Sequence, residues 1–195
     1  MKGKNNKFVE ITKADIFRYY IGWEDTDKEL IEAIKKGDEE QFHVFLKNMT
    51  IARNFKKNTY KDVYKLTREY VKRNTSEYDV NNFSDLLFQA QLLAGDNKNA
   101  IVAASKILWI YNKEKTIIYD SRAKNALKNI SEKKGLDDYT DYCKAWKEQY
   151  KVFKSRYLEK IKENEIDKLD SLFKQEWFIR RTFDNYLWYR GKTEK

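Results

Sequence analysis

The stretch AASKILWIYNKEKTIIYDSRAKNAL, residues 103–127, contains the features that decide the fold. Residues 100–110 form a run that is apolar on most of a helical circumference, which is typical of a helix at the centre of a helical protein. A short β-branched piece, residues 116–118, follows and should be extended. Asp120 then precedes a second helical run, in a position where aspartate commonly caps helices. We therefore expect Asp120 at a helix start near the centre of the fold.

Helical periodicity recurs along the whole chain, and glycines that are typical of helix C-terminal caps follow most of the helical runs. The glycines concerned are Gly22, Gly37, Gly95, Gly135 and Gly191. The expected helices are residues 12–21, 26–36, 38–55, 60–74, 84–94, 97–111, 121–134, 138–163 and 166–190. Extended structure is expected only near residues 116–119. The prediction is one all-α domain over residues 1–195, a compact bundle of about eight or nine helices. If it has two lobes, the seam is expected near residues 72–84.

Two of these helix starts are expected from capping residues. Thr26 and Glu29 have the spacing of a capping box, in which the two side chains satisfy each other's backbone N–H groups. Ser84 precedes the apolar run of residues 85–94 and belongs to the residue types that cap helices. Helices should therefore begin close to residues 26 and 84.

Composition excludes several classes of protein. The 41% of hydrophobic residues suffice for a globular core, and no apolar run approaches the roughly 18 residues of a membrane span. The first residues lack the apolar stretch of a signal peptide, so a cytoplasmic protein without a membrane partner is expected. One cysteine, Cys143, and one histidine, His43, cannot build a zinc site or an iron–sulfur cluster. We expect no metal and no other cofactor.

The net charge of +9 and a pI near 9.3 favour a polyanionic partner such as nucleic acid. The excess consists mostly of lysine, with 31 Lys against 9 Arg, in a chain rich in asparagine and without proline. A genome rich in A and T produces the same composition. A role of the charge in solubility alone therefore stays open.

Few residues suggest catalysis. Cys143 and His43 lie in no nucleophile motif and are expected to be structural, and the glycine-rich loops that bind nucleotide phosphates are absent. Acidic clusters at residues 24–27, 39–40 and 137–141 fall at expected helix starts, where carboxylates interact favourably with the helix dipole. These clusters are expected to stabilise helices rather than to bind a metal.

Asp120 allows two interpretations. As a plain N-cap, its side chain accepts backbone N–H bonds and stabilises the helix that follows. The same bonds favour the ionised carboxylate, which in a partly dry site can stabilise a developing positive charge. Capping and catalysis thus require the same geometry.

The order of apolar helix, short extended segment and Asp-capped helix in residues 103–127 resembles the core of the helix-hairpin-helix DNA glycosylase superfamily. The similarity is greatest to its small members with the 8-oxoguanine DNA glycosylase fold, and it implies a glycosylase-like helical bundle. In that superfamily a two-helix hairpin holds the DNA backbone and the catalytic aspartate caps the next helix, a position that Asp120 matches. Residues 178–192, FIRRTFDNYLWYRGK, resemble the last helix of the small members.

The hairpin itself departs from the family pattern. The usual Leu-Pro-Gly-Val-Gly is replaced here by LAGDN, residues 93–97, in which only the first glycine survives. No lysine matches the position that forms a Schiff base in bifunctional members, because Lys98 is only near it and Lys106 lies two turns later. The resemblance therefore implies a monofunctional enzyme.

The implied reaction is hydrolysis of the N-glycosidic bond of a damaged or modified base, flipped out of double-stranded DNA. Asp120 would stabilise the positive charge that develops on the deoxyribose and would orient the attacking water. DNA phosphates would be held by the hairpin and by nearby side chains, namely Gly95, Asn97, Lys98, Asn99, Lys106, Arg122 and Lys124. The flipped base would stack in a pocket of aromatic residues, namely Trp109, Tyr119, Trp188 and Tyr189.

Two alternatives stay open. The altered hairpin suits a basic helical module that binds DNA or RNA without catalysis. A helical interaction protein, such as a component of a phage–host conflict system, would use the charge only for solubility. Small glycosylases that attack modified viral DNA connect phage defence with the first interpretation.

Overall fold

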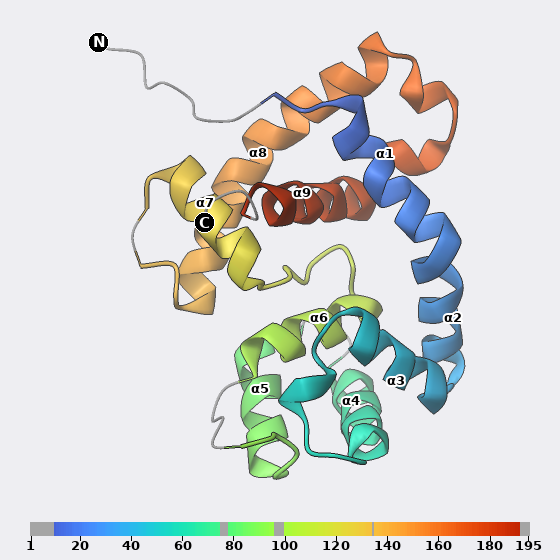
Figure 1. Ribbon diagram of the computed structural model, residues 1–195, viewed down its shortest axis with the longest axis vertical. Coiled ribbons are helices and arrows are strands. Elements are labelled where there is room, and N and C mark those ends of the chain that lie inside the picture. Colours follow the sequence, from blue (N-terminus) through green and yellow to red (C-terminus); the bar gives the residue numbers. More distant parts are fainter. Residues whose placement is uncertain (1–9, 75–77, 96–99, 134, 192–195) are drawn as a thin grey trace. The chain divides into compact units, whose positions relative to one another are not determined.

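The computed structural model describes residues 10–74, 78–95, 100–133 and 135–191 (Figure 1). Its α-helices are α1 Lys13–Gly22, α2 Lys28–Lys36, α3 Glu39–Asn48, α4 Tyr60–Arg73, α5 Val80–Gln89, α6 Ile101–Tyr111, α7 Ser121–Ser131, α8 Tyr139–Glu163 and α9 Glu176–Arg190. Shorter helical turns are the π-helical turn η1 Trp23–Asp27 and the 3-10 turns η2 Ala52–Asn54, η3 Ile166–Lys168 and η4 Ser171–Lys174. The described ranges contain no strand, only an isolated bridge between Phe55 and Leu93. The all-α prediction is confirmed.

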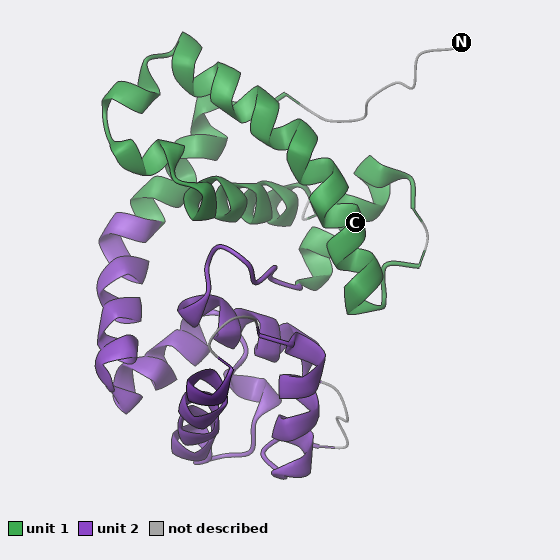
Figure 2. Cartoon of the chain, turned by 180° about the vertical axis from the view of Figure 1, so that it is seen from behind, with its two compact units in different colours: residues 1–22, 120–195 green, residues 23–119 purple. Residues whose placement is uncertain are grey.

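The helices form two compact units (Figure 2). Unit 1 comprises residues 1–22 and 120–195, with α1, α7, α8 and α9, and unit 2 comprises residues 23–119, with α2 to α6. The stretch 72–84, where a seam between lobes was expected, lies inside unit 2. The reason is that α5 packs on both α6 and α4 and so belongs to the same core as the helices on either side of it. The chain passes between the units next to Gly22 and next to Asp120 instead.

The capping box expected at Thr26 does not form. The chain stays helical from Lys13 to Lys36, and Thr26 lies within the π-helical turn η1. Asp27, which precedes α2, has helical backbone angles and makes no capping hydrogen bond with its side chain. A capping box needs an extended residue before the helix, and the continuous helix removes that residue.

The helix expected to start at Ser84 begins earlier, at Val80. The carboxylate of Asp79 caps α5 by accepting the backbone N–H groups of Asn81 and Asn82 at 2.9 and 3.1 Å. Ser84 is therefore an internal residue of α5, 1% exposed, and its hydroxyl accepts the N–H of Ala100 at 2.8 Å. Ser84 stabilises the start of α6 rather than its own helix.

The predicted glycine stops agree with the structure in part. Gly37 ends α2 with a left-handed φ of 118°, as expected. Gly95 and Gly135 also have positive φ, but they lie beyond the helix ends, because α5 ends at Gln89 and α7 ends at Ser131. In α7 the left-handed cap is Glu132 rather than the glycine.

The core of unit 1 is mainly aromatic. Trp146 of α8 is fully buried, stacks on Tyr150 with 4.8 Å between ring centroids, and meets Phe183 of α9 edge-on at 5.1 Å. Phe153 extends the cluster, with its ring 4.9 Å from that of Phe183. Such pairs contribute about 0.5–1.5 kcal/mol each beyond their buried area, so α8 and α9 are held together mainly by rings.

The core of unit 2 is mainly aliphatic and is centred on α6. Its side chains from Ala103 to Ile110 are all buried, with exposed fractions between 0% and 7%. Helices α5, α4 and α2 all pack on α6. The prediction that residues 100–110 form a central helix is confirmed within this unit.

Candidate functional site

Asp120 caps α7. Its backbone is extended, with φ −134° and ψ 138°, and its Oδ1 accepts the N–H of Arg122 at 3.0 Å. The preceding residues, Thr116 to Tyr119, are all buried, so the segment that leads to the aspartate is packed in place. The Tyr119 N–H donates to the hydroxyl of Ser105 on α6 at 3.0 Å. The predicted cap is confirmed, and the carboxylate itself is partly exposed to solvent.

The end of α9 lies directly against the start of α7 in unit 1. The guanidinium of Arg122 is 4.6 Å from the ring centroid of Trp188, a cation–π arrangement. A Cβ atom on Gly191, the residue that follows α9, would overlap the backbone carbonyl of Arg122. The absence of a side chain at Gly191 therefore allows the contact between the two helices.

The two aromatic residues predicted on α9 are partly covered. Trp188 and Tyr189 are both half-buried, and their rings meet edge-on at 5.1 Å. Arg122 lies over Trp188, and Arg18 of α1 lies over Tyr189 at 4.1 Å. In this conformation each ring has one face occupied by an arginine.

A second carboxylate, Asp184 of α9, is buried in unit 1, and sequence reasoning did not identify it. It is 5% exposed, accepts the indole N–H of Trp146 at 2.8 Å and lies 4.0 Å from the guanidinium of Arg181. Burial raises the pKa of Asp184 to about 6, against the lowering influence of Arg181 and Trp146, and the charge of Asp120 also raises this pKa. The spacing of Arg181 and Asp184, which places them on one helix face, is the signal in the sequence that points to this pair.

Lys124 is already paired. Its Nζ lies 2.6 Å from Oδ1 of Asp137, which also attracts Lys128 at 3.5 Å. The hydrogen bond from Lys124 holds the pKa of Asp137 below its usual value. Contact of Lys124 with a DNA phosphate would have to replace this pair.

In unit 2, the predicted site residues on and near α6 are internal. Trp109 is 1% exposed and Tyr119 is 8% exposed. Lys106 is 7% exposed, and its Nζ donates to the carbonyl of Met49 at 3.2 Å. Lys106 therefore points into the core of unit 2 and not toward a surface phosphate, and Trp109 is a core residue rather than an open stacking platform.

The hairpin residues are only partly described. Gly95 is exposed and has a φ of 63°, which favours glycine. Asn97, Lys98 and Asn99 lie outside the described residues. The predicted main-chain grip on a phosphate stays a prediction.

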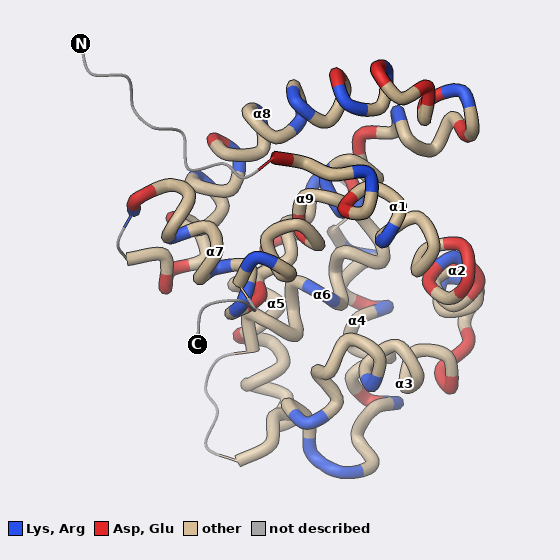
Figure 3. The backbone as a smooth tube through the Cα atoms, turned by 45° about the horizontal axis from the view of Figure 1, so that its top comes forward, with Lys and Arg blue, Asp and Glu red and all other residues tan. Residues whose placement is uncertain are grey.

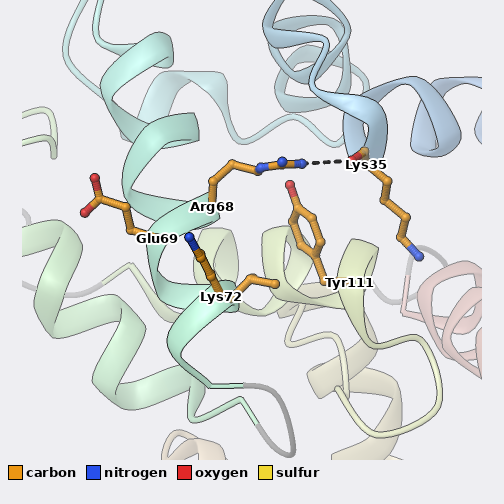
Figure 4. Close-up of a pocket in the computed structure, with 6 residues that line it drawn as sticks. Lys35, Arg68, Glu69, Lys72 and Tyr111 are labelled. Atoms are coloured by element: carbon orange, nitrogen blue, oxygen red, sulfur yellow. Dashed lines mark hydrogen bonds between the residues drawn. The ribbon is translucent and has the colours of Figure 1, made fainter.

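The described part of unit 2 contains at least two pockets. The first, of about 460 Å³, is lined by Lys35, Arg68, Glu69, Val71, Lys72 and Tyr111 (Figure 4). In it Arg68 donates to the carbonyl of Lys35 at 2.8 Å, and burial raises the pKa of the Tyr111 hydroxyl, which has no hydrogen-bond partner among the described groups. The second pocket, of about 500 Å³, lies between α3 and the loop that follows it and has the cations Arg53, Lys56 and Lys57 in its lining.

The structure argues against other chemistry within the part of the chain that it describes. Burial raises the pKa of the Cys143 thiol to about 11, so this cysteine is protonated at neutral pH and is not an activated nucleophile. The described residues contain no group of three or more His, Cys, Asp or Glu side chains placed to hold a metal ion. Among the described helices none is both long and apolar enough to cross a membrane.

Comparison with protein-family models, curated proteins and solved structures found no match to this chain. The function is therefore inferred from the chemistry of the site. The features that bear on it are the Asp120 cap, the contact between the start of α7 and the end of α9, and the distribution of positive charge.

Proposed function

We propose that this protein is a monofunctional DNA glycosylase of the helix-hairpin-helix type, with Asp120 as its catalytic carboxylate. The observation that carries the proposal is the position of Asp120, an aspartate that caps a helix directly after a buried extended segment and remains partly open to solvent. A carboxylate fixed in this way undergoes little rearrangement when positive charge develops beside it. It is therefore suited to stabilise an oxocarbenium-like deoxyribose and to orient the water that attacks it.

The charge of unit 1 supports a polyanionic substrate. Unit 1, which contains Asp120, has 24 Lys and Arg against 16 Asp and Glu, a net charge of +8, whereas unit 2 has 16 against 15, a net charge of +1. A positive field around the candidate carboxylate attracts DNA and raises the rate of encounter. The substrate class that fits is duplex DNA with a damaged or modified base, which is easier to flip than a normal base.

The test is base release from a panel of duplexes that contain oxidised, alkylated, deaminated or glucosylated bases, followed by alkaline cleavage of the abasic product. Asp120→Asn should abolish release while duplex binding survives, because the amide cannot stabilise the positive charge. Asp120→Ala serves as the structural control, since it also removes the cap and should lower the free energy of unfolding by about 1 kcal/mol. Full activity of Asp120→Asn would rule out this catalytic role.

A second candidate is a nucleic-acid-binding protein without catalysis. It is favoured by the core position of Trp109 and by the arginines that cover Trp188 and Tyr189, which leave fewer free aromatic faces for a base. Salt-dependent duplex binding without abasic product from any member of the panel would select this candidate.

A further inference from the structure

The segment of residues 41–60 has an unusual composition. It contains Lys47, Arg53, Lys56 and Lys57 and not one Asp or Glu, although 31 of the 195 residues of the chain are acidic. Figure 3 shows the part of this segment that follows α3 as a blue loop without red. The small net charge of unit 2, +1, thus does not reveal a local concentration of positive charge.

The loop that carries these cations has a fixed backbone. Two buried residues, Ile51 and Phe55, anchor it, with exposed fractions of 1% and 7%. Its main chain pairs with the segment before Gly95, because the Lys56 N–H donates to the carbonyl of Leu92 at 3.0 Å and the Ala94 N–H donates to the carbonyl of Asn54 at 2.9 Å. We call residues 52–58 the basic loop.

The cations of the basic loop face solvent around a hollow. Arg53, Lys56 and Lys57 are exposed, and none of them forms an ion pair with the described residues. They line the pocket of about 500 Å³ together with His43 and Tyr60, whose rings stack at 4.3 Å with an interplanar angle of 13°. The Tyr60 hydroxyl donates to Glu40 at 2.6 Å, which fixes the ring. The hollow therefore combines unpaired positive charge with a flat, rigid aromatic surface.

We propose that the basic loop, with the His43–Tyr60 pair beside it, binds the sugar–phosphate backbone of duplex DNA. Unpaired Arg and Lys side chains are the main protein partners of phosphate diesters, and contacts of this kind position DNA without reading its sequence. Three flexible cations on an open surface fit an extended polyanion, whereas a small-molecule site buries most of its ligand. That the polyanion is DNA rests on the proposed function.

The pocket lined by Lys35, Arg68 and Tyr111 fits this role less well. The guanidinium of Arg68 is already used there in a hydrogen bond to the carbonyl of Lys35, drawn as a dashed line in Figure 4. In the basic loop, by contrast, the three cations are exposed and have no acidic residue nearby in the sequence.

The experiment compares duplex binding by the full chain and two triple variants, measured as fluorescence anisotropy over a range of salt concentrations. Arg53→Gln, Lys56→Gln and Lys57→Gln remove the charge of the basic loop. Lys36→Gln, Lys65→Gln and Arg73→Gln remove the same charge from other exposed positions of unit 2 and serve as the matched control. All six positions are on the surface, so thermal unfolding should confirm that both variants fold.

The loop variant should bind at least about tenfold more weakly, and its slope of log K against log salt should fall by about 2 to 3, close to one unit for each lost phosphate contact. In the control variant, the affinity for the duplex and the slope of log K against log salt should change little. Equal binding by the loop variant and the control, beside tight wild-type binding, overturns this site and leaves the proposed function standing. Absence of duplex binding by the wild-type chain overturns the proposed function and this site with it.

Discussion

Unit 1 holds nearly all the net charge of the chain, yet a loop of exposed cations without acidic neighbours in the sequence lies in unit 2. In unit 1, cations repeatedly meet carboxylates, as in Lys124–Asp137, Lys133–Glu148 and Lys154–Glu176. In unit 2, the basic loop collects its cations without such pairs. Net charge thus indicates which unit attracts a polyanion from a distance, whereas unpaired local charge indicates where contact is made.

The same contrast extends to the two cores. Unit 1 buries the carboxylate of Asp184 among aromatic rings, while the buried polar side chains of unit 2 include hydroxyls that hydrogen-bond the backbone, such as Ser84 and Ser105. A buried acid titrates and a hydroxyl does not. The stability of unit 1 should therefore depend on pH in a range where that of unit 2 does not.

The largest effect is expected for Asp184→Asn. Because burial raises the folded-state pKa of Asp184 to about 6, the stability that its protonated form provides is present below the unfolded value near 3.8 and is lost as the pH rises through about 6. At pH 7.5 the neutral amide should raise the free energy of unfolding by up to about 3 kcal/mol, while at low pH the variant and wild type should converge. Urea unfolding of the variant and the wild type at several pH values measures the difference at pH 7.5 and the convergence at low pH. A variant that is destabilised at pH 7.5 and approaches wild type only at low pH would show that Asp184 stabilises the fold as an anion.

A smaller effect is expected for Gly191→Ala, also in unit 1. The new methyl group would overlap the carbonyl of Arg122, so α9 and α7 would have to separate, and the free energy of unfolding should fall by about 2 kcal/mol. Gly22→Ala is the control, because a Cβ there meets nothing within 4 Å and alanine favours a helix by up to about 1 kcal/mol. The midpoint temperatures of thermal unfolding should shift in opposite directions, down for Gly191→Ala and up for Gly22→Ala. Equal midpoints would mean that α9 does not need close contact with α7.

The smallest effect is expected in unit 2, for Ser105→Ala. The substitution leaves the buried Tyr119 N–H without its acceptor at 3.0 Å, which should cost about 1–2 kcal/mol. Ser155→Ala, at an exposed position of α8, should change stability by less than about 0.5 kcal/mol. The cost at Ser105 should be the same at pH 5 and pH 7.5, and a cost that changes between them would remove the contrast between the units.

The features that could be predicted from the sequence are those with local signals. The central helix follows from a continuous apolar run, and the Asp120 cap follows from one residue beside a helical pattern. The predicted start of α5 was wrong because Asp79 and Ser84 are both residue types that cap helices. The Ser84 hydroxyl instead accepts the N–H of Ala100, a residue that is distant in the sequence. Local propensity cannot include that partner.

The unpredicted parts of the candidate site depend on contacts between distant residues. Lys106 is internal because its ammonium meets the carbonyl of Met49, 57 positions earlier, and Asp184 is buried because Trp146, 38 positions earlier, donates to it. The basic loop differs from these residues, because its lack of acidic residues can be read from the sequence. That its cations form no ion pair with the described residues can be seen only in the structure.

The division into units also has a consequence for the order of synthesis. Unit 2 is one uninterrupted stretch that ends at Tyr119, so its helices can pack as soon as that residue has left the ribosome. Helix α1 is made before all of unit 2, but within unit 1 it packs on α9, which follows unit 2 in the sequence. Ile16 and Tyr19, which are buried in the folded protein, must therefore lack the packing of α9 until that helix has been translated. Helix α1 is thus made before unit 2 but completes its packing after it.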